Sequence, residues 1–105
     1  MGVPDQLFTA LAQSQKGAQM TSDKGVVTFD YDGQAFAVLT QKGQGLLKLE
    51  APQHAALVSL CPKGVSADQI DGWTSVTFKA MEAALLADYV GAAYRTVAPK
   101  ARLVF

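Results

Sequence analysis

The 105-residue sequence predicts a two-layer α+β domain in which helices pack on a mainly antiparallel sheet. Strand-like segments rich in β-branched and aromatic residues lie between segments whose apolar residues recur at helical spacing. Hydrophobic residues make up 50% of the chain and charged residues 17%, which is enough apolar material for a buried core. We therefore expect a single domain over residues 1–105, in the order helix, three-stranded meander, helix, strand, helix.

The first predicted element is a short amphipathic helix over residues 4–16. A proline lies in its first turn and a glycine follows its last turn, as is typical of helix ends. Its apolar positions at helical spacing are Leu7, Phe8, Leu11 and Ala12. The next residues, 17–25, are polar and are predicted to form an irregular connection.

A β-hairpin is predicted over residues 26–40. Asp32-Gly33 separates VVTFDY from QAFAVLT and is a two-residue turn signal that requires positive φ. A regular register then gives three facing pairs on the core side: Tyr31 with Gln34, Phe29 with Phe36, and Val27 with Val38. The other side of the hairpin, called the mixed side, carries Thr28, Asp30, Ala35, Ala37 and Leu39.

A third strand is predicted in GLLKLE, residues 45–50. Alternation directs Leu47 and Leu49 inward and leaves Leu46 and Lys48 on the mixed side. The glycines of the preceding QKGQG segment, residues 41–45, are attributed to hairpin geometry, because the segment matches no phosphate-binding motif.

Two further helices and a connection complete the prediction. A helix over residues 52–61 is bounded by prolines, with Ala56, Leu57 and Leu60 on one face. In the connection 62–72, Ser66 and Gln69 have capping-box spacing, which predicts a short helical turn. The long helix over residues 80–98 has an apolar stripe composed of Leu86, Val90, Ala93 and Val97, widened by Leu85 and Tyr89.

The fourth strand, residues 73–78, begins with the single tryptophan of the chain. Alternation places Thr74, Val76 and Phe78 on one side and Trp73 on the other, and two large apolar residues assign the first side to the core. Trp73 is then expected on the mixed side, with Leu39 and Leu46. Local packing against small residues, a contact surface for a partner and nucleobase stacking are three possible roles, in that order of preference.

No set of residues predicts catalysis, a metal site or a cofactor. His54 is the single histidine and Cys61 the single cysteine, and neither has a paired base or a ligand set at metal-binding spacing. Cys61 is expected to be a small buried apolar residue. We expect a non-enzymatic protein.

The charge and the N-terminal sequence limit the partners. Nine basic and nine acidic residues leave no net charge to attract phosphate backbones, so nucleic-acid binding requires a local basic patch. The start resembles no signal peptide and no apolar run has membrane-spanning length, so a cytoplasmic protein without membrane contact is expected. The candidate nucleic-acid contacts are Lys42, Lys48, Lys79, Arg95, Lys100 and Arg102. The last three lie near the end of the final helix, where cations also offset the helix dipole.

Three stretches resemble the MmcQ/YjbR-like family of small bacterial proteins: DGQAFAVLTQKGQGLLKLE, GWTSVTF and AALLADYVGAAYRTVAPK. The similarity covers roughly residues 26–100 and includes the family's hairpin, its GWT strand and its closing helix ending in APK. The resemblance implies an α+β domain of the broad class that includes type III secretion chaperones. It also implies DNA binding without catalytic residues, and with no net charge this binding is expected to be weak and salt-dependent. A protein-interaction or chaperone-like module that uses the mixed side, including self-association, is the alternative.

Overall fold

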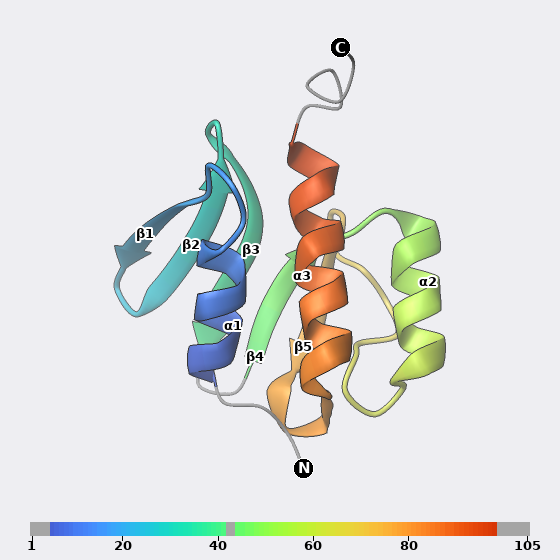
Figure 1. The fold of residues 1–105 in the computed structure, drawn as a ribbon. Helices are drawn as coiled ribbons and strands as arrows, with labels where there is room; N and C mark the ends of the chain where they lie inside the picture. Colours follow the sequence, from blue (N-terminus) through green and yellow to red (C-terminus); the bar gives the residue numbers. More distant parts are fainter. Residues whose placement is uncertain (1–4, 42–43, 99–105) are drawn as a thin grey trace.

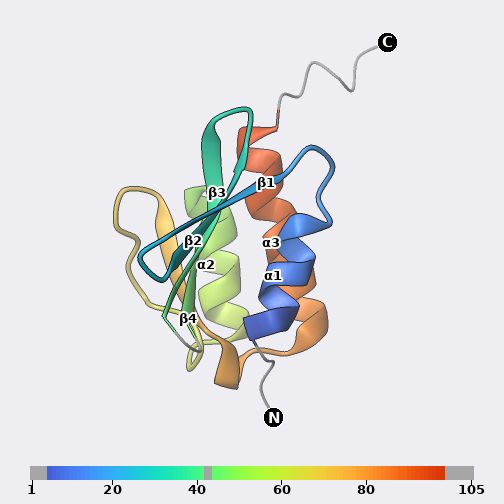
Figure 2. The same cartoon turned by 90° about the vertical axis from the view of Figure 1, so that its left-hand side faces the viewer.

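The computed structural model describes residues 5–41 and 44–98 and confirms the predicted α+β class (Figure 1). Five strands form one antiparallel sheet in chain order, and the helices pack as a second layer (Figure 2). The elements are α1 (Asp5–Gln13), β1 (Gln19–Asp23), β2 (Val26–Tyr31), β3 (Gln34–Gln41), β4 (Gln44–Lys48), α2 (Ala51–Leu60), β5 (Trp73–Thr77), a 3₁₀ turn (Phe78–Ala80) and α3 (Ala83–Val97).

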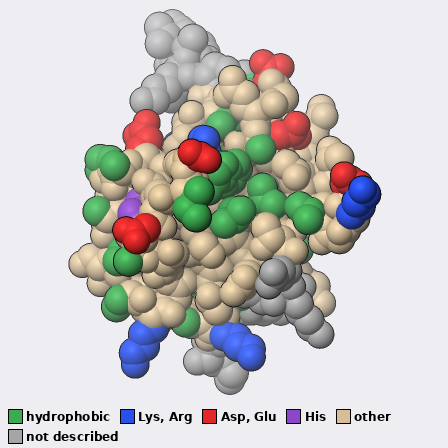
Figure 3. Space-filling model, turned by 180° about the vertical axis from the view of Figure 1, so that it is seen from behind, with side chains coloured by type: hydrophobic (Ala, Val, Ile, Leu, Met, Phe, Trp, Pro, Cys, Tyr) green, Lys and Arg blue, Asp and Glu red, His purple; other side chains and the backbone are tan. Residues whose placement is uncertain are grey.

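The two faces of the sheet have different surroundings. One face packs against α1 and α3 and is called the helix face (Figure 1). No described helix covers the other face, which is called the outer face. Seen from this side, hydrophobic side chains gather in the middle, with acidic and basic side chains around them (Figure 3).

The predicted irregular connection before the hairpin contains the strand β1, so that prediction is wrong. Every residue of β1 is exposed, which explains why no apolar alternation marked it. The strand forms because Lys24 and Gly25 make a two-residue turn with φ of 53° and 84°, and Asp23 pairs with Val26 across it. Asp32 and Gly33 make the same kind of turn with φ of 52° and 83°, which confirms the predicted hairpin turn.

A β-bulge in β3 changes the predicted register. Asp30 pairs with Ala35 but Phe29 pairs with Ala37, so Phe36 is an extra residue on this strand. The predicted pairs of Phe29 with Phe36 and of Val27 with Val38 are therefore wrong. Phe36 and Ala37 are consecutive and both fully buried.

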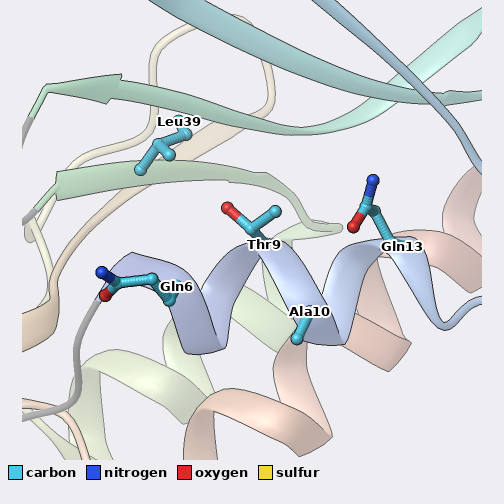
Figure 4. A pocket seen from close by; sticks show the side chains of 5 residues that line it. All are labelled: Gln6, Thr9, Ala10, Gln13 and Leu39. Carbon is cyan, nitrogen blue, oxygen red and sulfur yellow. The ribbon is translucent and has the colours of Figure 1, made fainter.

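Beyond the bulge, the side chains of β3 lie on the opposite faces from those predicted. Leu39 pairs with Val27 and Gly45 and packs against the core. It lines a groove on the helix face together with residues of α1 (Figure 4). Val38 pairs with Thr28 and Leu46 on the outer face. The assignment of Leu39 to the same side as Trp73 is thus wrong, and Val38 occupies that side instead.

Phenylalanine rings fill the core between sheet and helices. Phe8 of α1 lies 5.0 Å from Phe78 and 6.1 Å from Phe29 between ring centroids. A Cβ on Gly45 would lie 2.9 Å from Cζ of Phe78 and 3.1 Å from Cζ of Phe8. Close packing of two rings against β4 therefore explains this glycine, and the attribution to hairpin geometry is wrong for Gly45.

The long helix α3 starts later than predicted, after the 3₁₀ turn, but buries the predicted stripe. Leu86, Val90 and Ala93 are fully buried. Tyr94 packs edge-on against Tyr31 and Phe36, and its hydroxyl donates a hydrogen bond to the Lys16 carbonyl. These contacts join the end of α3 to β2, to β3 and to the segment that follows α1.

The helix α2 buries a different face from the one predicted. Leu57 is buried as expected, but Ala56 is exposed and Leu60 is 64% exposed. The second buried residue is His54. The apolar pattern indicated the wrong stripe because a histidine with polar partners occupies the inward position.

The connection 62–72 forms no helical turn at Ser66–Gln69, so the capping-box prediction is wrong. It runs along the free edge of β5 instead. The Ser66 amide donates to the Ser75 carbonyl (2.9 Å), and the Thr77 amide donates to Gly64 (2.7 Å). Ile70 and Trp73 exchange two backbone hydrogen bonds.

Candidate functional site

Strand β5 confirms the predicted alternation around Trp73. Thr74 and Val76 are buried on the helix face, whereas Trp73 and Ser75 are partly exposed on the outer face. Trp73 is therefore not part of the buried core, and a regular strand holds it on the outer face.

Four apolar side chains on the outer face form what we call the outer patch: Val38, Leu46, Ile70 and Trp73. Leu46 pairs with Val38 on one side and with Ser75 on the other, and Ile70 pairs with Trp73. Paired residues direct their side chains to the same face. Ile70 is 75% exposed, which is unusual for a large aliphatic residue.

A pocket of about 220 Å³ opens in this patch. Its walls combine apolar and polar residues: Leu46, Ser66, Asp68, Ile70, Asp71, Trp73 and Ser75. Cofactor and drug-like ligands usually occupy about 300–1,000 Å³, so the pocket fits one side chain better than a cofactor. Asp68 and Asp71 are exposed and give the pocket an acidic border.

Lys48 lies beside Trp73 on the outer face but is engaged locally. Its ammonium is 5.2 Å from the centroid of the indole ring, which is a cation–π distance. The same Nζ donates a hydrogen bond of 3.2 Å to the carbonyl of Asp71. Lys48 is not among the residues that line the pocket. The lysine therefore contacts Trp73 and leaves the pocket open.

The structure does not bring the described cations of the predicted nucleic-acid set together. Lys48 lies on the outer face, at the Trp73 end of β5. Lys79 is exposed in the 3₁₀ turn that follows the other end of β5. Arg95 is exposed on α3, where it borders a small pocket with Glu50. Lys42, Lys100 and Arg102 lie outside the described residues.

A buried polar network that no sequence pattern indicated holds the loop that carries the acidic border. Nε2 of His54 is 2.9 Å from the Ala67 carbonyl, and its Nδ1 is 2.9 Å from Oγ1 of Thr74. Gln69 donates to the same Thr74 oxygen (3.2 Å) and to the Leu49 carbonyl (2.8 Å).

The hydrogen-bond partners indicate which tautomer His54 adopts. A carbonyl only accepts, so Nε2 carries the proton and Nδ1 accepts from the Thr74 hydroxyl. The Thr74 oxygen in turn accepts from Gln69. Both ring nitrogens of His54 thus have a partner, and the side chain ties α2, β5 and the 62–72 segment together.

The remaining chemistry-bearing residues form no site in the described part of the chain. Cys61 is half-buried and its thiol donates to the Ala80 carbonyl (3.1 Å). Among residues 5–41 and 44–98, no three His, Cys, Asp or Glu side chains are placed to hold a metal ion. In the same ranges, no helix has the length and apolar character that crossing a membrane would require.

The comparisons with known proteins give a fold. No family model and no curated protein matches the sequence. Among solved structures, the chain is similar to the Deinococcus radiodurans protein DR2400, which has a DUF419 domain. The two superpose with a TM-score of 0.72 and 20% sequence identity, over 95% of this chain and 81% of that one. At this identity the likeness shows a shared fold, in agreement with the predicted architecture.

Proposed function

We propose that this chain is a non-enzymatic, MmcQ/YjbR-like binding domain that recognises a protein segment through the outer patch. The observation that carries the proposal is the exposed pocket beside Trp73 on a sheet face that no described helix covers. Tryptophans in such positions are typical anchors of protein interfaces, where they contribute much of the binding free energy. The motifs DGQAFA and GWTSVTF support the family assignment.

Charge favours a protein partner over DNA at this surface. Asp68 and Asp71 border the pocket, and carboxylates repel the phosphates of a nucleic acid that would stack on Trp73. The cation beside Trp73 is Lys48, and it is engaged with the indole ring and the Asp71 carbonyl. The DNA binding implied by the family resemblance therefore finds little support in the described cations.

A peptide array tests the proposal. The labelled full-length chain is applied to 15-residue peptides of varied composition, together with Trp73→Ser and the control Leu60→Ser. Leu60 is a matched control because it is a large exposed apolar residue on α2, away from the outer patch. We expect wild type and Leu60→Ser to bind the same peptides, and Trp73→Ser to lose about tenfold or more in affinity.

Two outcomes would contradict the proposal. One is an array in which no peptide distinguishes Trp73→Ser from wild type. The other is binding to duplex DNA at low salt that persists in Trp73→Ser but is lost when Lys48, Lys79 and Arg95 are replaced together.

A further inference from the structure

The pocket in the outer patch combines two chemistries that few side chains satisfy together. Leu46, Ile70 and Trp73 make most of its wall apolar. Two exposed acidic residues, Asp68 and Asp71, also line it. An aliphatic side chain would fill the wall but leave the carboxylates without a new partner, and an acidic side chain would be repelled.

An arginine side chain matches both features. Its methylene stem packs along apolar surface while the charged tip reaches a polar border. The planar guanidinium stacks on aromatic rings and binds carboxylates in a two-pronged geometry, which the compact lysine ammonium does not reproduce. The volume of about 220 Å³ suits one such side chain.

The border is held in place before any ligand arrives. Gln69 lies between the two aspartates in the chain, and its side chain donates hydrogen bonds to the Leu49 carbonyl and the Thr74 hydroxyl. The Ala67 carbonyl accepts a hydrogen bond from His54. The double hydrogen bond between Ile70 and Trp73 fixes the loop to the strand. A preorganised site loses less entropy on binding than a loop that must first be ordered.

We infer that the pocket is an arginine-recognition site, which takes an arginine side chain of the partner segment between Trp73 and the carboxylates of Asp68 and Asp71. The inference rests on the proposed function and specifies its ligand. It also gives the exposure of Ile70 a role, since this residue lines the pocket.

Blocked seven-residue peptides, Gly-Ser-Ala-X-Ala-Ser-Gly, test it with X as arginine, lysine, citrulline or norleucine. Binding to the full chain is followed by the fluorescence of Trp73, the single tryptophan, and by the NMR signal of its indole N–H. Citrulline is the matched probe because it keeps the shape of arginine and lacks the charge. We expect arginine to bind about tenfold more tightly than citrulline, with lysine between them.

The double variant Asp68→Asn, Asp71→Asn is expected to abolish the preference for arginine over citrulline. Asp71 has φ of 54°, and asparagine tolerates that conformation, so the loop should keep its structure. The control Asp23→Asn, Asp32→Asn makes the same change in charge at two exposed sites, the end of β1 and the turn between β2 and β3, and should leave the preference unchanged.

Equal binding of arginine and citrulline, or a preference that survives Asp68→Asn, Asp71→Asn, would overturn the inference. Norleucine binding as tightly as arginine would also overturn it. If the peptide array still distinguished Trp73→Ser from wild type, the proposed function would stand without the arginine preference. If the array showed no such difference, the proposed function would fail and the inference would fail with it.

Discussion

The two faces of the sheet use the same strands for different purposes. On the helix face, Phe29, Leu47 and Val76 are completely buried, and aromatic rings pack against one another. On the outer face, Leu46 of β4 and Trp73 of β5 are partly exposed and line a pocket with an acidic border. Because alternate residues of one strand belong to different faces, adjacent substitutions can separate stability from recognition.

The largest expected difference between the faces comes from two adjacent leucines of β4. Leu47→Ala should lower the free energy of unfolding by about 2–5 kcal/mol, because it leaves a cavity in a close-packed core. Leu46→Ala removes the same atoms from a partly exposed position and should cost about 1 kcal/mol or less. Urea unfolding of both variants measures the difference. Equal losses would show that the faces are not energetically distinct.

A second, smaller difference is expected from two adjacent residues of β5. Thr74→Val keeps the shape of the side chain but removes the hydroxyl that donates to Nδ1 of His54, at a cost of about 1–3 kcal/mol. Thr74→Ser retains the hydroxyl and should recover part of this loss. Ser75→Val, on the outer face, should change the free energy of unfolding by no more than about 0.5 kcal/mol.

Thermal or urea unfolding of the three β5 variants decides whether the polar network matters. If Thr74→Val and Ser75→Val unfolded at the same denaturant concentration, the hydrogen bonds of His54 would contribute nothing measurable to stability.

The smallest expected effect lies wholly on the outer face. Lys48→Met keeps most of the aliphatic stem but removes the cation above Trp73, which should cost about 0.5–1 kcal/mol. The tryptophan emission should change at the same time. Lys79→Met makes the same change in charge beyond the other end of β5 and should leave the emission unaltered. An emission change in both variants would point to a general charge effect.

The sequence predicted the parts of the fold in which local signals and packing agree. The Asp32-Gly33 turn follows from the need for positive φ, and β5 follows from uninterrupted alternation between Trp73 and Phe78. These two predictions correctly placed Trp73 on the outer face.

The rest depended on interactions that no short sequence window contains. Phe36 and Ala37 are both buried because tertiary packing favours a bulge, and this reversed the predicted side of Leu39. The strand β1 is exposed throughout, so only the glycine of its turn could have signalled it. The acidic border of the pocket belongs to the 62–72 segment, which is held by hydrogen bonds to His54. His54 in turn contacts Thr74, which is 20 residues away in the chain, so no short window of sequence contains this network.

The hydrogen bonds along β5 also limit how copies of this protein can associate. The 62–72 segment already binds both backbone groups of Trp73, the carbonyl of Ser75 and the amide of Thr77. Within the described residues, β1 is thus the sheet edge that remains available for pairing. A filament needs two free edges in every copy, whereas pairing through β1 alone closes at two copies. Among residues 5–41 and 44–98, the loop that lines the pocket thus also leaves the sheet with one edge for pairing between copies instead of two.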